Sequence, residues 1–216
     1  MSSRPHPLAS AIAWAGRIAS GVTTQWVDCR PEERQRIYYA NHTSHLDAVV
    51  LWSALPGHIR RYIRPIAAAD YWTATPTRRY LASRVFRAVL VDRHEHGAQL
   101  PEGERMSRAR TVIQRIAAEM GENNSLIVFP EGTRGTGEQV ANFKSGLYYL
   151  SRERPDVELV PVYLENLNRV LPKGEFLMVP VLCSVTFGPP VRVQDGEAKH
   201  DFLARAHKAL CDLRRN

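Results

Sequence analysis

The sequence predicts a single α/β domain, with a mainly parallel, mixed central sheet flanked by helices and an amphipathic helix at the N-terminus. Apolar, β-branched runs alternate along the chain with segments whose apolar residues recur at helical spacing, the pattern of a covered parallel sheet. Two polar clusters, residues 41–47 and 129–134, each directly follow a strand-like run. The 216 residues contain no repeat, low-complexity tract or interdomain linker, which is consistent with one compact domain.

The stretch from residue 8 to 27 has the length of a membrane span, but Arg17 and several polar residues interrupt it. A spanning helix needs about 20 predominantly apolar residues. At helical spacing, one face collects Leu8, Ile12, Ala15, Ala19, Val22 and Trp26, which predicts an amphipathic helix. This helix either lies among lipid headgroups, with Trp14 and Trp26 at the interface, or packs on the domain core. The spacing of its apolar residues does not distinguish a lipid partner from a protein partner. We therefore divide the chain into residues 1–30, the helical segment, and residues 31–216, the main domain.

The remaining elements follow from β-branched runs, helical spacing and turn residues. Strands are expected at residues 36–40, 63–69, 88–91, 125–129, 157–164 and 182–187. Helices are expected at residues 46–54, 77–86, 106–120, 145–152 and 201–213. Because open α/β sheets bind ligands at the carboxyl ends of their strands, the polar clusters after two of these strands are candidate site residues.

Composition limits the classes of partner. A formal charge of +7 predicts attraction to nucleic acid, a phosphorylated ligand or an acidic membrane surface. The three cysteines are far apart and odd in number, which supports neither a disulfide framework nor a Cys-x-x-Cys metal site and favours a reducing, cytoplasmic setting. No apolar run with a small-residue cleavage site opens the chain, so we expect no secretory signal.

The densest basic region lies between residues 60 and 87, where aromatic side chains are interleaved with arginines. Its arginines are those at positions 60, 61, 64, 78, 79, 84 and 87. No nucleic-acid-binding motif accompanies them, so we expect no nucleic-acid partner. Three explanations of this basic region remain: it is a solvated face, it attracts the substrate, or it contacts an anionic membrane surface.

The two polar clusters carry a resemblance to a known family. Residues 41–47 contain Asn-His-x-Ser-x-x-Asp, and residues 129–134 are Phe-Pro-Glu-Gly-Thr-Arg. Two shorter blocks, Val91-Asp92-Arg93 and Val160-Pro161-Val162, complete a set of four in the family's order. The chain therefore resembles the glycerolipid acyltransferases of the 1-acyl-sn-glycerol-3-phosphate (lysophosphatidate) type, over residues 36 to 165. This resemblance implies an O-acyltransferase.

The first cluster supplies a base and an orienting carboxylate. Transfer of an acyl group from a thioester to an alcohol requires removal of the hydroxyl proton, for which a neutral histidine is suited. His42 is the candidate base, and Asp47, one tight turn later, can fix its tautomer and support the imidazolium. His45 is a rival base that we interpret as lining the site. The alternative is a helix N-terminus at which these residues only cap free amides and Asp47 favours the helix dipole.

The second cluster has the composition of an anion site. Gly132 lets the backbone approach a ligand closely, Thr133 offers a hydroxyl, and the Arg134 guanidinium suits a phosphate. Glu131 would repel a phosphate, so we assign it to holding Arg134 or to contacting the glycerol hydroxyl. Arg93, which the resemblance favours, and Lys144 are further candidates for the same phosphate. A strand-to-helix turn with a surface Arg–Glu pair and solvated cations is the alternative.

These interpretations combine into one expected activity. The protein moves a fatty acyl group from acyl-coenzyme A or acyl carrier protein to the 2-hydroxyl of 1-acyl-sn-glycerol 3-phosphate, forming phosphatidate in phospholipid biosynthesis. We expect no metal or tightly bound cofactor, and a peripheral location on the cytoplasmic face of the membrane. Other acceptors, namely another lysophospholipid or an amino-acid-headed lipid, remain open. More remote alternatives are a non-catalytic basic membrane-binding module and a metal-dependent hydrolase with His42, His45 and Asp47 as ligands.

Overall fold

The computed structural model describes residues 7–92, 101–167 and 183–214. Its centre is a seven-stranded sheet in the order β1-β7-β6-β2-β5-β3-β4. The strands are β1 Thr23–Trp26, β2 Arg36–Ala40, β3 Ile63–Ala68, β4 Val89–Val91, β5 Ser125–Val128, β6 Glu158–Glu165 and β7 Ser184–Phe187. The helices are α1 Pro7–Ser20, α2 Asp47–Ala54, α3 Gly57–Arg60, α4 Ala69–Thr73, α5 Pro76–Tyr80, the π-helical turn η1 Leu81–Val85, α6 Glu102–Met120, α7 Gly146–Glu153 and α9 Lys199–Cys211.

The sheet is mixed, with β2 at its middle. β2 pairs in parallel with β5 on one side and with β6 on the other, and β3 and β4 continue the parallel arrangement beyond β5. β7 runs antiparallel to β6, and β1 pairs in parallel with β7. Because the chain adds β5 and β6 on opposite sides of β2, the strand order reverses at β2, where sheets of this kind place their ligand site. The predicted α/β fold with a mainly parallel sheet is confirmed.

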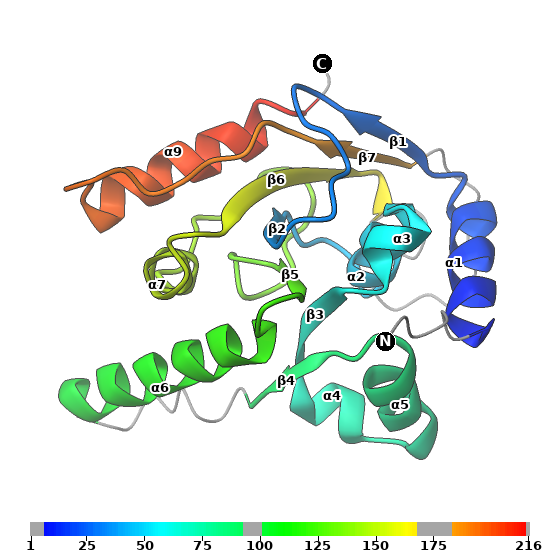
Figure 1. The fold of residues 1–216 in the computed structure, drawn as a ribbon, viewed down its shortest axis with the longest axis horizontal. Coiled ribbons are helices and arrows are strands. Elements are labelled where there is room, and N and C mark those ends of the chain that lie inside the picture. The colour runs from blue at the N-terminus through cyan, green and yellow to red at the C-terminus, as the bar shows by residue number, and fades with distance from the viewer. Residues whose placement is uncertain (1–6, 93–100, 168–182, 215–216) are drawn as a thin grey trace.

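Helices cover both faces of the sheet, giving three layers (Figure 1). Helices α1, α2 and α3 lie on one side, and α6, α7 and α9 lie on the other. The alternation along β2 divides its side chains between the two cores: Tyr38 and Ala40 face the α1–α2 side, and Ile37 and Tyr39 face the α6–α9 side. All five residues of β2 are buried, as expected for a strand covered on both faces.

The N-terminal helix is shorter than predicted, and the face that packs on the core is shifted: Ile12 packs there as predicted, but with Ala9 and Ala13, while Leu8 and Ala15 are exposed. It ends at Ser20, before Gly21 with its positive φ of 52°, and residues 23–26 form the edge strand β1. Ala13 is 2% exposed against α2, and Arg17 donates hydrogen bonds to the carbonyls of Ser53 (2.6 Å) and Leu55 (3.1 Å) at the end of α2. No helix within the described ranges is both long and apolar enough to cross a membrane.

The helix predicted at 77–86 is confirmed as a continuous helical segment over residues 76–85, but its second half is π-helical. α5 ends at Tyr80, and η1 follows with a wider π-helical hydrogen bond from the Phe86 amide to the Leu81 carbonyl, at 2.9 Å. Val85 and Phe86 then reach the core against Trp52. The short helix α4, immediately after β3, was not predicted, because five residues carry too little periodicity to distinguish a helix from the end of a strand.

Candidate active site

Two loops meet at the carboxyl edge of the central strands. Tyr39 in β2 lies opposite Val128 in the parallel neighbour β5, so the loops that follow these strands emerge side by side. One loop carries residues 41–47, and the other carries residues 129–134. The two clusters that are 89 residues apart in sequence are joined by a hydrogen bond from the His42 amide to Glu131 Oε1, at 2.7 Å. The sheet thus assembles the site from its two predicted halves.

His42 and Asp47 form a direct contact. Nδ1 of His42 lies 2.8 Å from Oδ2 of Asp47, and the same oxygen accepts the backbone N–H groups of Thr43 (2.6 Å) and Ser44 (2.8 Å). Asp47 is fully buried, whereas the His42 side chain is 20% exposed. A neutral His42 that donates from Nδ1 therefore presents its unprotonated Nε2 to the accessible side of the site. Asp47 accepts hydrogen bonds from loop amides and also orients His42. The two interpretations of this cluster, as a cap of free amides and as a base with its orienting carboxylate, therefore each describe part of its geometry.

Phe129 fixes the plane of the imidazole. Its ring stacks on His42 with centroids 4.3 Å apart and an interplanar angle of 22°. The contact comes from the residue that directly follows β5, so the register of β2 and β5 determines it. With Asp47 holding Nδ1 and Phe129 covering one face, the ring has little freedom to rotate.

Glu131 contacts backbone amides, and not Arg134, which was the first of its two expected partners. Its side chain is 4% exposed, and its two carboxylate oxygens accept the amides of His42 (2.7 Å) and Ala141 (2.8 Å). Among the residues that the structure describes, Glu131 forms no ion pair with Arg134, which corrects the expectation that it holds this arginine. Because both oxygens face the protein, we assign Glu131 to positioning the loop that carries His42.

Asn41 anchors the same loop to the neighbouring strand β6. Its side-chain amide donates to the Leu164 carbonyl at 2.9 Å, and its Oδ1 accepts the Leu164 amide at 2.7 Å. Asn41 is buried, so these two bonds satisfy polar groups that water does not reach. The residue steadies the loop, as the sequence suggested.

The turn after Pro130 lies against one of the predicted cationic residues, Lys144. Gly132 has a φ of +74°, and a Cβ atom placed on it would lie 2.9 Å from Cδ and Cε of Lys144. The Lys144 side chain therefore lies over Gly132, and its own amide donates to the Pro130 carbonyl at 2.9 Å. Thr133 and Arg134 are exposed on this turn. Arg93, the remaining predicted phosphate ligand, lies outside the described residues.

Gly132→Ala is expected to lower activity more than stability. The methyl group meets a positive φ and the Lys144 chain together, so it strains the turn and displaces a cation. We expect turnover to fall about tenfold or more, while the free energy of unfolding falls by roughly 1–2 kcal/mol. Gly196→Ala is the matched control, because Gly196 also has a φ of +74° but no atom within 4 Å of its Cβ position. Equal losses of turnover in the two variants would contradict this account.

His45 does not share the Asp47 contact. Its ring stacks on Tyr71 with centroids 5.1 Å apart and an interplanar angle of 20°. Desolvation lowers the pKa of His45, and the positive charges of Arg134, His42 and Arg78 lower it further. His45 is therefore neutral near neutral pH, and it stays a prediction that it lines the site. Within the described part of the chain, no group of three His, Cys, Asp or Glu side chains is arranged to hold a metal ion.

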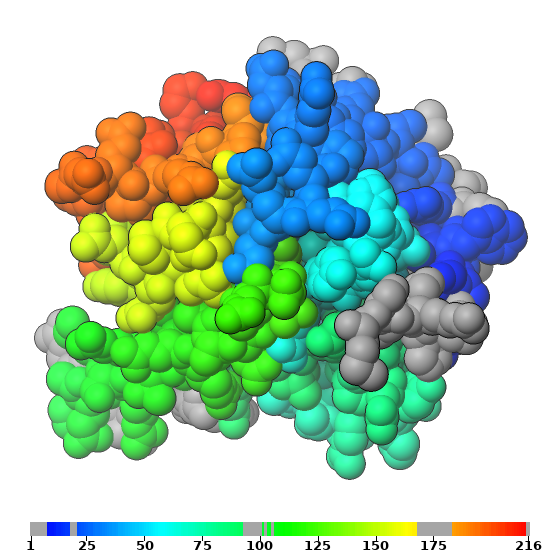
Figure 2. Space-filling model, viewed as in Figure 1, coloured from blue at the N-terminus to red at the C-terminus, as the bar shows by residue number. Residues whose placement is uncertain are grey.

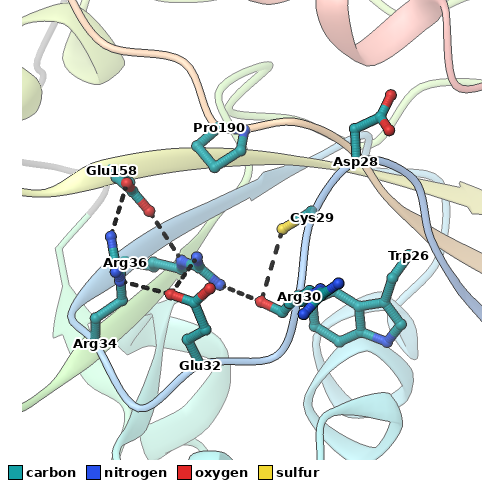
Figure 3. Close-up of a pocket in the computed structure, with 9 residues that line it drawn as sticks. All are labelled: Trp26, Asp28, Cys29, Arg30, Glu32, Arg34, Arg36, Glu158 and Pro190. Carbon is teal, nitrogen blue, oxygen red and sulfur yellow. Dashed lines mark hydrogen bonds and ion pairs between the residues drawn. The ribbon is translucent and has the colours of Figure 1, made fainter.

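One cavity lies away from these residues. Its volume is about 550 Å³, and it contains the first residues of β2 and β6, Arg36 and Glu158, so it lies at the opposite edge of the sheet from His42. Figure 3 shows Glu32 and Glu158 facing the guanidinium groups of Arg34 and Arg36, with N–O distances of 2.7 to 3.4 Å. In the space-filling view, the segment leading into β2 lies between the α3 side and the β6 side (Figure 2). Because its charges compensate one another, we interpret this cavity as structural.

Sequence reasoning assigned no specific role to Phe129, Tyr71 or Arg78. Phe129 belongs to the second cluster, but nothing in its spacing indicates a stack on His42. Tyr71 and Arg78 belong to the basic, aromatic region between residues 60 and 87. The signal that would have found them is an aromatic residue followed seven positions later by an arginine, and that pattern alone is too common to indicate a site.

Comparison with known proteins identifies similar sequences and a similar fold. The family model described as Acyltransferase matches residues 22–165. The 1-acyl-sn-glycerol-3-phosphate acyltransferase of Limnanthes alba is 29% identical over 191 residues, which cover 88% of this chain and 60% of that protein. The enzyme of the same name from Limnanthes douglasii is 29% identical over 164 residues, covering 76% of this chain and 52% of that protein. The chain thus spans less than two thirds of either relative's length.

An animal protein is similar in sequence to this chain, and a solved structure is similar in fold. The 1-acyl-sn-glycerol-3-phosphate acyltransferase alpha of Ovis aries is 26% identical over 162 residues, covering 74% of this chain and 50% of that protein. The crystal structure of the 1-acyl-sn-glycerophosphate (LPA) acyltransferase PlsC from Thermotoga maritima superposes with a TM-score of 0.70 at 19% identity. That match covers 95% of this chain and 78% of the other, and it supports the fold.

Proposed function

The chain belongs to the Acyltransferase family, and on this premise we propose that it transfers a fatty acyl group from an acyl thioester to the 2-hydroxyl of 1-acyl-sn-glycerol 3-phosphate, forming phosphatidate. The observation that carries the proposal is the 2.8 Å contact between His42 Nδ1 and the buried Asp47 carboxylate, beside a turn that carries Arg134 and is covered by the Lys144 side chain. The names of the similar proteins support this choice of substrate.

The reaction needs a base that accepts one proton and returns it. Nε2 of His42 takes the proton of the acceptor hydroxyl as its oxygen attacks the thioester carbonyl carbon. Asp47 stabilises the resulting imidazolium through Nδ1–H, and its fully buried position strengthens that interaction. The tetrahedral intermediate then expels the thiolate, which takes the proton from His42. The acceptor hydroxyl is the nucleophile, so no covalent acyl-enzyme is required.

We assign the acceptor phosphate to the turn at residues 132–134 and to Lys144. Gly132 allows close approach of the backbone, and the Arg134 guanidinium and the Lys144 ammonium supply positive charge. Arg93 is a further candidate for the same phosphate on the strength of the resemblance. The donor is acyl-coenzyme A or acyl carrier protein, since both present the same thioester, and the proposed chemistry uses no metal or tightly bound cofactor.

The proposal is tested by thiol release from palmitoyl-coenzyme A and from palmitoyl acyl carrier protein, each with and without 1-acylglycerol 3-phosphate. We expect release that depends on the acceptor and a stoichiometric amount of phosphatidate by mass spectrometry. Acceptor-independent release would indicate a thioesterase. If folded protein used neither donor with this acceptor, lysophosphatidylglycerol and lysophosphatidylcholine would be tested next, and inactivity on all of them would refute acyl transfer.

We also propose that the protein attaches peripherally to the cytoplasmic face of an anionic membrane through α1. Trp14 is 69% exposed and Leu8 38% exposed on this helix, and the chain carries a net charge of +7. Exposed tryptophan on an amphipathic helix is suited to the interface between lipid and water. Such attachment would place the site where a lysolipid acceptor resides.

Trp14→Ser is expected to weaken vesicle binding roughly tenfold, because burial of a large apolar side chain stabilises by about 1.5–3 kcal/mol. Co-sedimentation with phosphatidylglycerol vesicles measures the effect, and phosphatidylcholine vesicles measure the share due to charge. Because Trp14 is exposed, the thermal unfolding midpoint should not change. Unaltered sedimentation of the variant would show that α1 is not the attached surface.

A further inference from the structure

A planar stack continues from the active-site loop to helix α5. The ring of His45, in the loop before α2, lies parallel to that of Tyr71 in α4, with centroids 5.1 Å apart. The guanidinium carbon of Arg78, in α5, lies 4.3 Å from the centroid of the same Tyr71 ring. Three groups from separate segments are thus held in contact. Stacking of this kind fixes a guanidinium while its N–H edges remain able to donate.

The Arg78 guanidinium has no anionic partner in the parts of the chain that the structure describes. Ion pairs within 4.0 Å there involve Arg34, Arg36, Arg61, Arg64, Arg154, Arg192 and Arg205. Each of these guanidinium groups is compensated by a carboxylate, but that of Arg78 is not. An arginine that is fixed in place, partly buried and uncompensated is suited to bind an anion from outside the protein.

Charge from α5 also reaches the active-site loop at His45. The Arg78 guanidinium acts on the His45 ring together with the charges of Arg134 and His42, and these charges add to desolvation in lowering the pKa of His45. His45 belongs to the loop at residues 41–47, and Tyr71 contacts both its ring and the Arg78 guanidinium. Positive charge therefore acts on this loop from the α4–α5 side as well as from Arg134.

We propose that Arg78 binds a phosphate group of one of the two substrates and that Tyr71 and His45 position it. The inference rests on the proposed function, in which both the acceptor and the donor carry phosphate: the monoester of 1-acylglycerol 3-phosphate, and the phosphates of coenzyme A or of the carrier protein's phosphopantetheine arm. A planar, forked guanidinium recognises each of these groups through the same paired N–H donors. Arg78 thereby extends the anion site beyond the cations that the sequence indicated.

Arg78→Gln is compared with Arg84→Gln, its matched control. Arg84 lies in η1, the next helical segment, is exposed, and forms no ion pair among the described residues. Calorimetric titration with coenzyme A and with monomeric 1-acylglycerol 3-phosphate measures affinity without turnover, and steady-state assays give KM and kcat. For Arg78→Gln we expect the affinity for one of the two ligands to fall roughly tenfold or more, with kcat nearly unchanged. The ligand affected identifies which substrate supplies the phosphate.

Tyr71 variants test the positioning role. Tyr71→Phe keeps the ring and should bind as wild type, whereas Tyr71→Leu removes the platform and should reproduce the loss seen in Arg78→Gln. Wild-type affinity for both ligands in Arg78→Gln, or an equal loss in Arg84→Gln, would overturn the inference while leaving acyl transfer by the wild type intact. A wild type that binds neither ligand would refute the proposed function and this inference together.

Discussion

His42→Ala is expected to abolish acceptor-dependent thiol release, with a fall in kcat on the order of 10²–10⁴-fold. The substitution removes the imidazole that contacts the buried Asp47 and is itself partly exposed. Because the His42 side chain makes no hydrogen bond besides that to Asp47 in the described structure, the loop amides keep their carboxylate partners. KM for both substrates should therefore change little. The diagnostic result is a large fall in kcat without a matching change in KM.

The chain contains a matched control for this experiment. His200 Nδ1 also lies 2.8 Å from an aspartate oxygen, that of Asp201 at the start of α9, but its side chain is 88% exposed and distant from the sheet edge. His200→Ala should retain wild-type turnover. If the two histidine variants lost activity equally, or if His42→Ala remained active, the assignment of His42 as the base would be wrong.

Asp47→Asn is expected to lower kcat by a similar order, about 10²–10⁴-fold, while leaving both substrates bound. The amide has nearly the shape of the carboxylate but lacks the charge that supports an imidazolium in the transition state. If its oxygen keeps the place of Oδ2, its NH2 group occupies the position of Oδ1, which is buried and has no hydrogen-bond partner among the described residues. If it flips, it offers a donor to His42 and selects the wrong tautomer.

The same substitution should also lower stability. Burial of an unsatisfied NH2 group costs about 1–3 kcal/mol, which chemical denaturation measures as a change in the free energy of unfolding. The control is Asp201→Asn, whose side chain is 64% exposed, and which should change neither stability nor turnover. Full activity of Asp47→Asn would show that the buried charge is not used in the reaction, and loss of binding without loss of kcat would assign it to substrate recognition.

The parts of the fold that sequence alone predicted are those determined by local pattern. Strands β2 and β5 contain the continuous apolar runs 37–40 and 126–128, and the contact between His42 and Asp47 spans one turn of chain. Both therefore follow from residues that are close in sequence. The boundaries of α2, α6, α7 and α9 were close to those predicted for the same reason.

The contacts that sequence did not predict depend on which backbone atoms the sheet brings together. Glu131 was assigned to Arg134 because the two are close in sequence, but its partners are the amides of His42 and Ala141. Likewise, residues 23–26 form a strand because β7, about 160 residues later, offers a parallel edge. Side-chain type does not encode partners of this kind, since any residue supplies an amide or a carbonyl.

The reciprocal pair between Asn41 and Leu164 also has a consequence for the order of events during synthesis. The loop that carries His42 leaves the ribosome early, yet both partners of the Asn41 side chain are backbone groups 123 residues further along the chain. Until β6 has emerged and docked, that loop lacks the bonds that hold it against the sheet. The nascent chain therefore completes its active site late, and acquisition of activity during translation reports the docking of β6 rather than the appearance of the catalytic residues.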